Sequence, residues 1–313
     1  MCRRRGFFVK KKLLFIYNAH AGKGRIRNAL ADILDTFAKK GYEITVLPTL
    51  KCGDATAVAR ERGKDFDLVV CSGGDGTLDE VVTGIFQTQR DIPIGYIPAG
   101  STNDYANSLG LPKRMRAAAE IAVGEEYCRC DMGTLGESIF VYIAAFGAFT
   151  EVSYATPQEI KNVLGHAAYL LEGMKKLHTI RSYHMKVRAN GEEIEDDFIY
   201  GMVTNSISVG GFKNNTNADV VLDDGLFEVT LIKNPKNAIE LQNIIASLLI
   251  QEFDSKYMYD FKASEIEFES MEEIPWTLDG EFGGNRRTVK IVNHKQAITI
   301  KVDTKKVSKL IEQ

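Results

Sequence analysis

The sequence lacks any apolar run long enough to cross a membrane. Its longest candidate, Ile239 to Ile250, is only about a dozen residues long and is interrupted by polar side chains, whereas a spanning helix needs about 20 apolar residues. Cysteine is also scarce: the five cysteines are odd in number and scattered, which argues against a disulfide framework and for a reducing cytoplasm. The net charge of -3 provides no general attraction to nucleic acid, and no Cys/His spacing typical of zinc occurs.

What is present is an ordinary globular composition, 44% apolar and 26% charged, over 313 residues. That length is sufficient for two domains, each with its own core. The first third alternates buried-type strands with amphipathic helices, a pattern that predicts a parallel sheet with helices on both faces. The expected strands are residues 12–18, 42–47, 68–71 and 94–98. We expect Asp54 to cap one of the helices.

After about Asp131 the pattern changes to many strands joined by short turns such as Asn190-Gly191 and Asp224-Gly225, which predicts an antiparallel sandwich. The expected strands are residues 140–145, 183–189, 197–205, 226–232, 266–269, 275–278, 288–292 and 297–302, and the expected helices are residues 159–177 and 237–249. We therefore expect an α/β nucleotide-binding domain over 1–131 and a β-sandwich domain over 132–295. A C-terminal segment, 296–313, would pack back on the first domain, and the active site would lie in the cleft between the two domains.

The most informative segment is Ser72 to Glu80, SGGDGTLDE, which follows a buried strand directly. Two glycines at the carboxyl end of a strand allow a close backbone turn, and a helix that begins there presents its amides as an anion site. Asp75 can orient a nucleotide or a hydrated metal, and the Thr77 hydroxyl can bond phosphate or cap the helix. A plain Gly-Asp-Gly turn with a threonine cap is the alternative, but the full run after a buried strand favours phosphate binding.

Three further segments carry polar side chains that suit a site. Ile97 to Tyr105, IPAGSTNDY, follows the next strand, and its Asn103 and Asp104 can cap a helix while facing a ligand. Asn217 to Leu226, NADVVLDDGL, and Trp276 to Glu281, WTLDGE, each also have an ordinary interpretation as a turn between strands. His20 lies in the first loop, and we assign it no role.

Taken together, these motifs resemble those of the bacterial diacylglycerol kinases and their relatives, the sphingosine kinases. GGDGT alone is shared with NAD kinases and phosphofructokinases, but the order GGDGTLDE, GSTNDY, DDG and LDGE covers nearly the full chain and is similar to the lipid kinases. The resemblance implies ATP and Mg²⁺ as cofactors, with Asp75 and Glu281 as catalytic residues and Glu281 accepting the proton of the acceptor hydroxyl. The implied nucleotide-binding residues are Gly73, Gly74, Asp75, Gly76, Thr77, Leu78, Asp79, Glu80, Ser101, Asn103 and Asp104. Thr49 is added to them because of its place at the end of the second strand. The implied magnesium ligands are the Asp224 carboxylate and the carbonyls of Val221 and Leu226.

Four positions depart from the family pattern. Ala19 stands where the family usually has proline after the asparagine of the first loop, and Ser101 replaces a threonine but keeps the hydroxyl. Asp79 replaces the usual asparagine, which adds negative charge near the phosphates. Asn217 stands where a proline often precedes the magnesium loop.

The resemblance implies a lipid kinase that transfers the γ-phosphoryl of ATP to diacylglycerol. The alternatives are a kinase of another lipid alcohol, such as a sphingoid base or polyprenol, an NAD kinase, or a non-catalytic nucleotide- or lipid-binding regulator. The expected partners are a lipid alcohol and a transient, peripheral contact with the inner face of the membrane from the cytoplasm, without nucleic acid and with a homodimer left open. The basic residues among 1–12 could contact anionic headgroups, although a solvated tail is the alternative.

Overall fold

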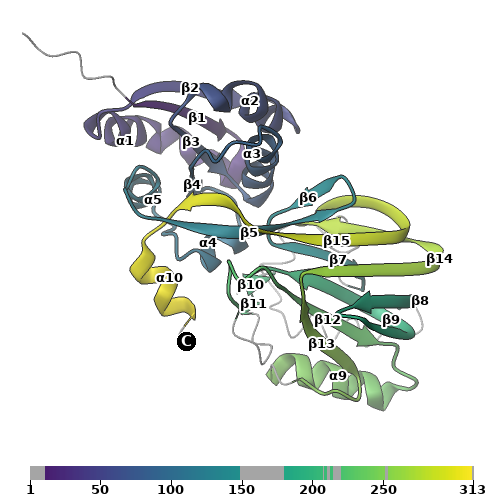
Figure 1. The fold of residues 1–313 in the computed structure, drawn as a ribbon. Helices are drawn as coiled ribbons and strands as arrows, with labels where there is room; N and C mark the ends of the chain where they lie inside the picture. The colour runs from purple at the N-terminus through teal and green to yellow at the C-terminus, as the bar shows by residue number, and fades with distance from the viewer. Residues whose placement is uncertain are drawn as a thin grey trace, which may run out of the picture. The chain divides into compact units, whose positions relative to one another are not determined.

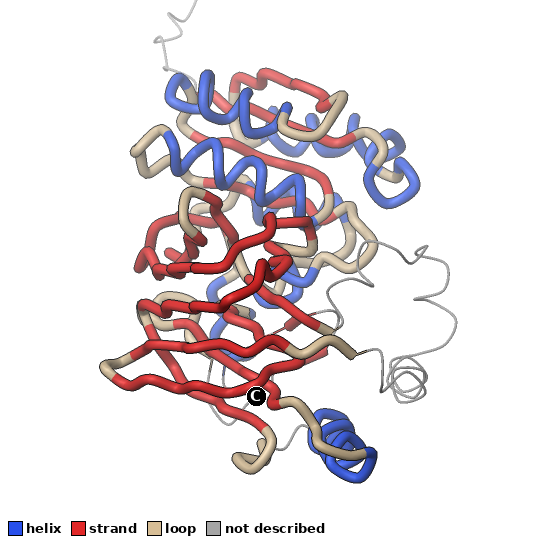
Figure 2. Tube along the Cα trace, turned by 90° about the vertical axis from the view of Figure 1, so that its right-hand side faces the viewer, coloured by secondary structure: helices blue, strands red, loops and turns tan. Residues whose placement is uncertain are grey.

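The computed structural model describes residues 11–148, 180–206, 208–209, 212–213, 220–250 and 253–311. The chain forms two compact units (Figure 1). Unit 1 comprises residues 1–130 and 297–313, and unit 2 comprises residues 131–296. In unit 1 helices and strands alternate, whereas strands make up most of unit 2 (Figure 2). The expected helix over 159–177 and most of the basic N-terminal segment lie outside the described residues.

Unit 1 is built on four parallel strands, as the alternation of strands and helices predicts. They are β1 (Lys12–Asn18), β2 (Glu43–Thr49), β3 (Leu68–Gly73) and β4 (Ile94–Pro98). The order is β4-β3-β1-β2, and every neighbouring pair is parallel. Every residue of β3 and β4 is buried, which explains why both strands read as continuous apolar runs rather than alternating ones.

Helices cover both faces of this sheet. On one face, α1 (Ile26–Lys39) and α5 (Met115–Ala122) bury their apolar side chains with Phe15, Val70 and Ile97. The other face is covered by α2 (Asp54–Arg62) and α3 (Asp75–Gln87). These two helices pack closely, because a Cβ on Gly84 would lie only 2.6 Å from the Ala59 Cβ. The remaining short elements are η1 (Ala21–Gly24), η2 (Gly63–Asp65) and α4 (Asp104–Ser108).

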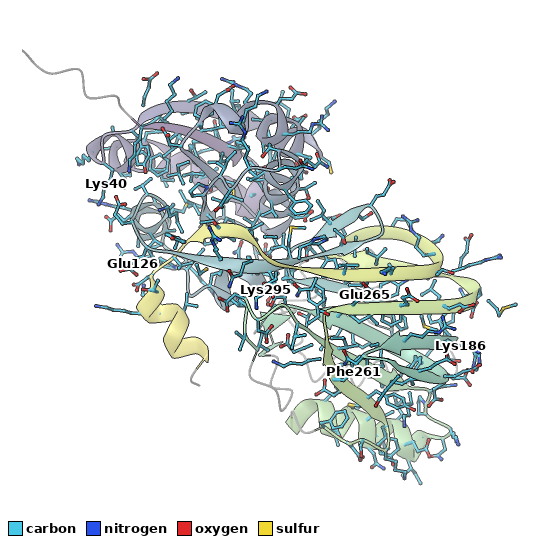
Figure 3. All side chains as sticks on the ribbon, in the orientation of Figure 1. Lys40, Glu126, Lys186, Phe261, Glu265 and Lys295 are labelled. Carbon is cyan, nitrogen blue, oxygen red and sulfur yellow. The ribbon has the colours of Figure 1, made fainter. Side chains whose placement is uncertain are left out.

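The C-terminal residues 297–313 belong to unit 1. Ile300 pairs in parallel with Ile94 of β4, and the Thr299 hydroxyl donates to the Asp91 carboxylate at 2.6 Å. The last helix, α10 (Thr304–Ile311), begins where Thr304 donates from its amide to Glu126 (Figure 3). These contacts add the end of the chain to the parallel sheet beside β4.

The described strands of unit 2 form mainly antiparallel pairs, as the sequence predicts. Its strands are β5 (Tyr127–Leu135, which begins in unit 1), β6 (Ser138–Phe140), β7 (Ile143–Gly147), β8 (Tyr183–Ala189), β9 (Glu192–Thr204), β10 (Ser208–Val209), β11 (Phe212–Lys213), β12 (Phe227–Lys233), β13 (Met258–Ala263), β14 (Glu265–Leu278) and β15 (Glu281–Lys301, which ends in unit 1). The two long strands β9 and β14 each pair with β7 at one end and with β8 at the other. One helix, α9 (Ala238–Ile250), interrupts the described strands close to where the sequence predicts it.

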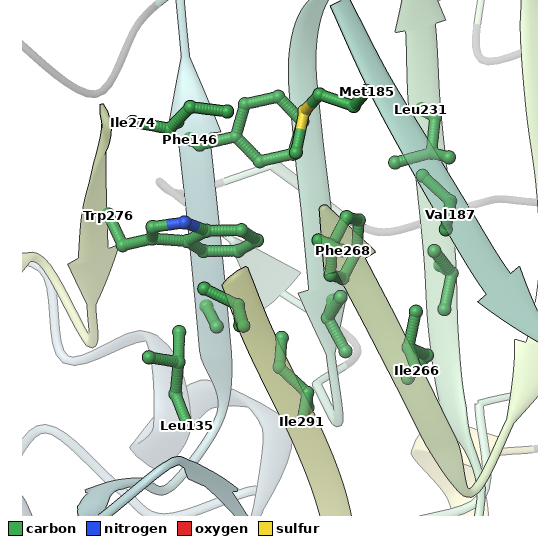
Figure 4. Close-up of a cluster of buried hydrophobic side chains, with 14 of the residues drawn as sticks. Leu135, Phe146, Met185, Val187, Leu231, Ile266, Phe268, Ile274, Trp276 and Ile291 are labelled. Carbon is green, nitrogen blue, oxygen red and sulfur yellow. The ribbon is translucent and has the colours of Figure 1, made fainter. Parts of the chain in front are cut away.

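The strands of unit 2 enclose an aromatic core (Figure 4). Trp276 is its largest fully buried side chain, and its ring centroid lies 5.0 Å from that of Phe146 and 5.1 Å from that of Phe268. The rings meet at steep angles, a geometry that aromatic pairs favour over face-to-face stacking. This core fixes the ends of β7 and β14, where the WTLDGE motif begins.

Several strand boundaries differ from those expected. The segments 266–269 and 275–278 are one strand, β14, with a register shift between Glu269 and Ile274, and the segments 288–292 and 297–302 are both part of β15. The expected strand 140–145 is two strands, β6 and β7, because the amides of Val141, Tyr142 and Ile143 donate to the Asp279 carboxylate. Of the described strands, β5, β10, β11 and β13 were not predicted, and β10 and β11 are only two residues long.

Among the described residues, no helix is both long enough and apolar enough to span a membrane.

Candidate active site

Three loops of unit 1 meet at the carboxyl ends of three strands. The first loop follows β1, the second follows β3 and the third follows β4. The first loop approaches the third so closely that a Cβ on Gly22, which has φ +53°, would lie 1.8 Å from the Ala99 carbonyl oxygen. The second and third loops also lie close together, since a Cβ on Gly100 would lie 2.6 Å from the Gly74 Cα. Backbone bonds join them as well, because the amides of Ala99 and Gly100 both donate to the Gly73 carbonyl. Glycine is therefore required for these backbones to converge.

The GGDGT segment forms the start of α3. Gly74 is the N-cap residue in an extended conformation, Asp75 is the first helical residue, and Gly76 the second. The first amides of a helix have no intrahelical acceptor, so this end of α3 is suited to bind phosphate oxygens. One alternative was that Thr77 caps the helix, but it does not: Thr77 lies in the first turn of α3. Its side chain lies over Gly73, so that a Cβ on Gly73 would be 2.2 Å from the Thr77 hydroxyl oxygen.

Asp75 links two of the loops. One of its carboxylate oxygens, Oδ2, accepts a hydrogen bond from the Asp104 amide at 3.2 Å, at the start of α4. Asp104 is buried and follows Asn103, which has φ +54°. The Asn103 side chain does not cap α4 as expected, because its amide group bonds the nitrogen and oxygen of Gly100 at 2.9 and 2.8 Å. Asn103 thus fixes the shape of the loop, while Ser101 lies exposed within it.

The other predicted nucleotide residues lie around the same helix. Leu78 is buried with its side chain in the core, and Asp79 is half-buried. Thr49 is the last residue of β2 and lies opposite Asn18 of β1. Glu80 does not point into solution: its two carboxylate oxygens accept from the amides of Gly53 and Ala55 at 2.9 and 3.0 Å.

Asp54 does not cap α2, contrary to the expectation from the sequence. Gly53, with φ +85°, is the N-cap residue and Asp54 the first residue of the helix. The Asp54 carboxylate bends back to accept from the amides of Leu50 and Lys51 at 2.8 and 3.0 Å, and the Leu50 and Lys51 amides hold its pKa below the usual value. The cap of α2 is supplied by Glu80, from another helix.

In unit 2, the WTLDGE motif ends β14 and begins β15. Asp279 and Gly280 form the turn with φ +49° and +89°. The buried Asp279 carboxylate accepts from the amides of Val141, Tyr142 and Ile143 at 2.5, 3.0 and 2.9 Å, a set of charge-assisted bonds that fixes the turn. Glu281, the first residue of β15, is exposed. The Glu281 carboxylate therefore extends from a turn that is fixed by hydrogen bonds.

The DDG cluster forms the loop before β12. Asn217 and the two residues after it lie outside the described residues, and Val220 and Leu222 are buried. Asp224 accepts from the Leu226 amide at 2.9 Å through Oδ1, and its Oδ2 lies 3.6 Å from the Lys262 ammonium. That ammonium also lies 3.2 Å from Glu228, whose burial raises its pKa to about 7.

Comparisons with known proteins show what the chain is similar to. Residues 12–135 match the diacylglycerol kinase catalytic domain, and residues 145–300 match the YegS C-terminal NAD kinase beta sandwich-like domain. The diacylglycerol kinase of Bacillus subtilis (strain 168) is 32% identical over 276 residues, which are 88% of this chain and 91% of that protein. The diacylglycerol kinase of Staphylococcus carnosus (strain TM300) is 31% identical over 93% of this chain and 95% of that protein.

The chain belongs to the diacylglycerol kinase family. It is a kinase. A crystal structure of a diacylglycerol kinase from Bacillus anthracis (strain Sterne) shares its fold, with a TM-score of 0.73 and 23% identity over 95% of this chain and 98% of that one. A second crystal structure from the same organism gives a TM-score of 0.77 at 25% identity, over 97% and 99% of the two chains.

One residue of this family member that the sequence analysis did not single out is Asp131 of β5. It is fully buried, and its carboxylate accepts from the amides of Gly225 and Gln296 at 2.6 and 2.7 Å. Burial raises its pKa, although these amides oppose the shift. Asp131 therefore anchors the turn that carries Asp224. The available signal was a single carboxylate within the strand sequence YCRCDMGTL, which by itself does not indicate a role.

The convergence of the loops gives a stability prediction for Gly22→Ala. The new methyl group would collide with the Ala99 carbonyl, and a left-handed φ is also strained for alanine. Gly41→Ala is the matched control, since Gly41 has φ +87° and nothing within 4 Å of a Cβ. Overpacking typically costs 1–3 kcal/mol, so we expect Gly22→Ala to lower the free energy of unfolding by about that much more than Gly41→Ala in urea titrations. Equal losses in the two variants would show that the first loop does not rest on the third.

Proposed function

We propose that this protein is an ATP-dependent lipid kinase that transfers the γ-phosphoryl of ATP to the hydroxyl of diacylglycerol, giving phosphatidic acid. The observation that carries the proposal is Glu281, an exposed carboxylate on the turn that Asp279 fixes through three amides. NAD kinases share GGDGT but lack this LDGE ending. The similarity to the family over nearly the whole chain supports the same assignment.

In this proposal the loops of unit 1 hold the triphosphate. The amides at the start of α3 bind phosphate oxygens, Asp75 and Asp104 keep two loops together, and Thr49 and Ser101 contact the nucleotide. Phosphoryl transfer depends mostly on positioning and on neutralising charge. As the lipid oxygen bonds to the γ-phosphorus, the bond from that phosphorus to the β–γ bridging oxygen breaks. Glu281 accepts the hydroxyl proton, and ADP leaves.

We propose that magnesium binds beside the Asp224 carboxylate. The Lys262 ammonium already lies beside Asp224 Oδ2, so a positive charge is favourable at this carboxylate, although magnesium would compete with the lysine. One carboxylate with the carbonyls of Val221 and Leu226 and several waters is a donor set that magnesium accepts. Bound magnesium would supply positive charge that neutralises the negative charge of the phosphates. Among the described residues, no group of three or more carboxylate, histidine or cysteine side chains could hold a metal ion, so the proposed site relies on one carboxylate together with carbonyls and waters.

We also propose where the protein acts and with what. Its substrate is a membrane lipid, so we propose a cytoplasmic protein that contacts the inner face of the membrane transiently and peripherally. The acceptor lipid is the partner that this function requires.

Replacement of Asp224 tests the magnesium assignment. We expect Asp224→Ala to lower turnover and to remove the rise in melting temperature that magnesium gives the wild type, because the loop loses its carboxylate ligand. Asp223→Ala is the control. The neighbouring Asp223 carboxylate accepts a long hydrogen bond, 3.4 Å, from the Gln296 side chain. Equal stabilisation of Asp224→Ala and wild type by magnesium would mean that Asp224 only shapes a turn.

The acceptor can be tested with a panel of purified alcohols. Diacylglycerol, sphingosine, undecaprenol and NAD are incubated separately with the protein, magnesium and ATP, and the kcat/KM for phosphorylation of each is compared. We expect diacylglycerol to give the highest value. A higher value for sphingosine, undecaprenol or NAD would replace diacylglycerol with that acceptor, and the absence of phosphorylation in all four would favour a non-catalytic regulator.

A further inference from the structure

Helix α3 is the element that links the loops of unit 1. At its start, Asp75 bonds the Asp104 amide of the loop after β4. Five residues further on, Glu80 bonds two amides of the segment after β2. At 100° per residue these two positions lie about 140° apart around the helix, so the two carboxylates reach in different directions. One helix thus connects the GGDGT segment to the loops on both sides of it.

The contact between Glu80 and α2 is built into the packing of the two helices. Glu80 and Gly84 are four residues apart and therefore share one face of α3. On that face Gly84 touches α2, where a Cβ would lie 2.5 Å from the Thr56 carbonyl oxygen. The bare backbone at Gly84 lets α3 approach α2, and Glu80 then reaches the amides of Gly53 and Ala55. The close spacing of the two helices thus brings Glu80 within reach of both amides.

The bonds from Glu80 complete the fixing of one short segment, Leu50 to Ala55. Asp54 accepts from its first two amides, those of Leu50 and Lys51, and Glu80 accepts from those of Gly53 and Ala55. The side chains of Leu50, Lys51 and Cys52 are exposed, Leu50 by 87%, so burial in the core does not hold this part of the segment. The two carboxylates supply four bonds that hold its backbone. Thr49 lies directly before this segment at the end of β2.

We propose that Glu80 is a positioning residue for ATP: its two bonds hold the segment after Thr49 in place, and Glu80 does not touch the nucleotide itself. The inference rests on the proposed function, in which Thr49 contacts ATP. Both Glu80 oxygens already accept charge-assisted bonds, so nucleotide contact would require them to be exchanged. The last residue of the SGGDGTLDE motif thereby ties the phosphate-binding helix to the nucleotide contact of the neighbouring strand.

The test combines two variants, Glu80→Ala and Glu80→Gln, with Glu61→Gln as the control, a carboxylate exposed on α2. Glutamine keeps one acceptor oxygen and serves if the alanine variant does not fold. Without nucleotide, amide hydrogen exchange at Gly53 and Ala55 should accelerate in both Glu80 variants and not in Glu61→Gln. Because a hydrogen bond to a charged group contributes more free energy than a neutral one, loss of the two bonds in Glu80→Ala should lower ATP affinity by about tenfold. Turnover at saturating ATP and the KM for the lipid should stay unchanged.

A double-mutant cycle separates positioning from direct contact. If Glu80 acts through the segment, Thr49→Ala should weaken ATP binding, and Glu80→Ala should cost much less in the Thr49→Ala background than in wild type. The inference would be overturned if the losses of ATP affinity in the two single variants simply added in the double variant, or if Thr49→Ala alone lost no ATP affinity. Unchanged amide hydrogen exchange at Gly53 and Ala55 in the Glu80 variants would overturn it as well. Wild-type protein that binds no ATP would instead overturn the proposed function, and with it the nucleotide role of Glu80, whereas the exchange measurement would still report on the two bonds.

Discussion

Glu281→Gln should lower turnover by roughly two to four orders of magnitude, the usual worth of general acid–base catalysis. Glutamine keeps the shape of the side chain and much of its hydrogen bonding but cannot accept the proton of the lipid hydroxyl. The turn beneath it should not change, because Asp279 retains its three amide bonds. ATP affinity should be nearly unaffected, since the phosphate loops belong to unit 1. Steady-state kinetics and calorimetry measure the two quantities separately.

Glu192→Gln is a closely matched control. Glu192 begins β9 directly after the turn Asn190-Gly191, as Glu281 begins β15 after Asp279-Gly280. The turn residues have similar left-handed φ values, +54° and +80° against +49° and +89°. Glu192→Gln should therefore retain full turnover. A Glu281→Gln variant that keeps more than about a third of wild-type turnover would reduce Glu281 to a turn residue, and the lipid-kinase proposal would lose the observation that carries it.

Asp75→Ala should abolish measurable activity and strongly weaken binding of Mg-ATP while the protein stays folded. The change removes a negative charge at the start of α3 and also the bond to the Asp104 amide, so two of the three loops lose a link. Asp75→Asn keeps one acceptor oxygen and should preserve the loops better than it preserves activity. Comparing the two variants separates the charge of Asp75 from its bond.

Asp67→Asn is the control for Asp75. The Asp67 carboxylate also accepts from a distant backbone amide, that of Lys12 at 2.7 Å, but at the start of β1 and therefore at the opposite end of the strands. It should leave activity and ATP affinity at wild-type values. Unchanged affinity for Mg-ATP in Asp75→Ala, measured by calorimetry, would remove Asp75 from the site.

The sequence predicts the elements of unit 1 well, because the signals are local. A buried parallel strand reads as a short apolar run, and glycines after β3 and β4 mark the turns where the loops converge. The turn at Asp279-Gly280 was likewise readable from two residues. These local signals do not show which distant backbone amides a carboxylate will bind.

Those distant bonds are the part that the sequence could not provide. Asp279 accepts from amides more than a hundred residues earlier in the chain, and Glu80 caps a helix that begins before its own. Both depend on the packing of whole elements, so both side chains looked like ordinary parts of a motif. The same reason explains the absence of Asp131 from the predicted residues. Asp54 was wrongly assigned as a cap because its carboxylate bonds the nearby amides of Leu50 and Lys51 instead, while the distant Glu80 caps the helix. The merging of two expected strands into β14 is similar, since exposed residues around Met271 break the apolar pattern while the backbone continues.

The most direct measurement is to incubate the protein with ATP labelled at the γ-phosphate, magnesium and a total lipid extract, and to identify the labelled product by chromatography and mass spectrometry. The account predicts a single major product, phosphatidic acid, formed by the wild type and lost in Glu281→Gln. Label in another phosphorylated lipid, or an extract that stays unlabelled while the protein binds ATP, would contradict it.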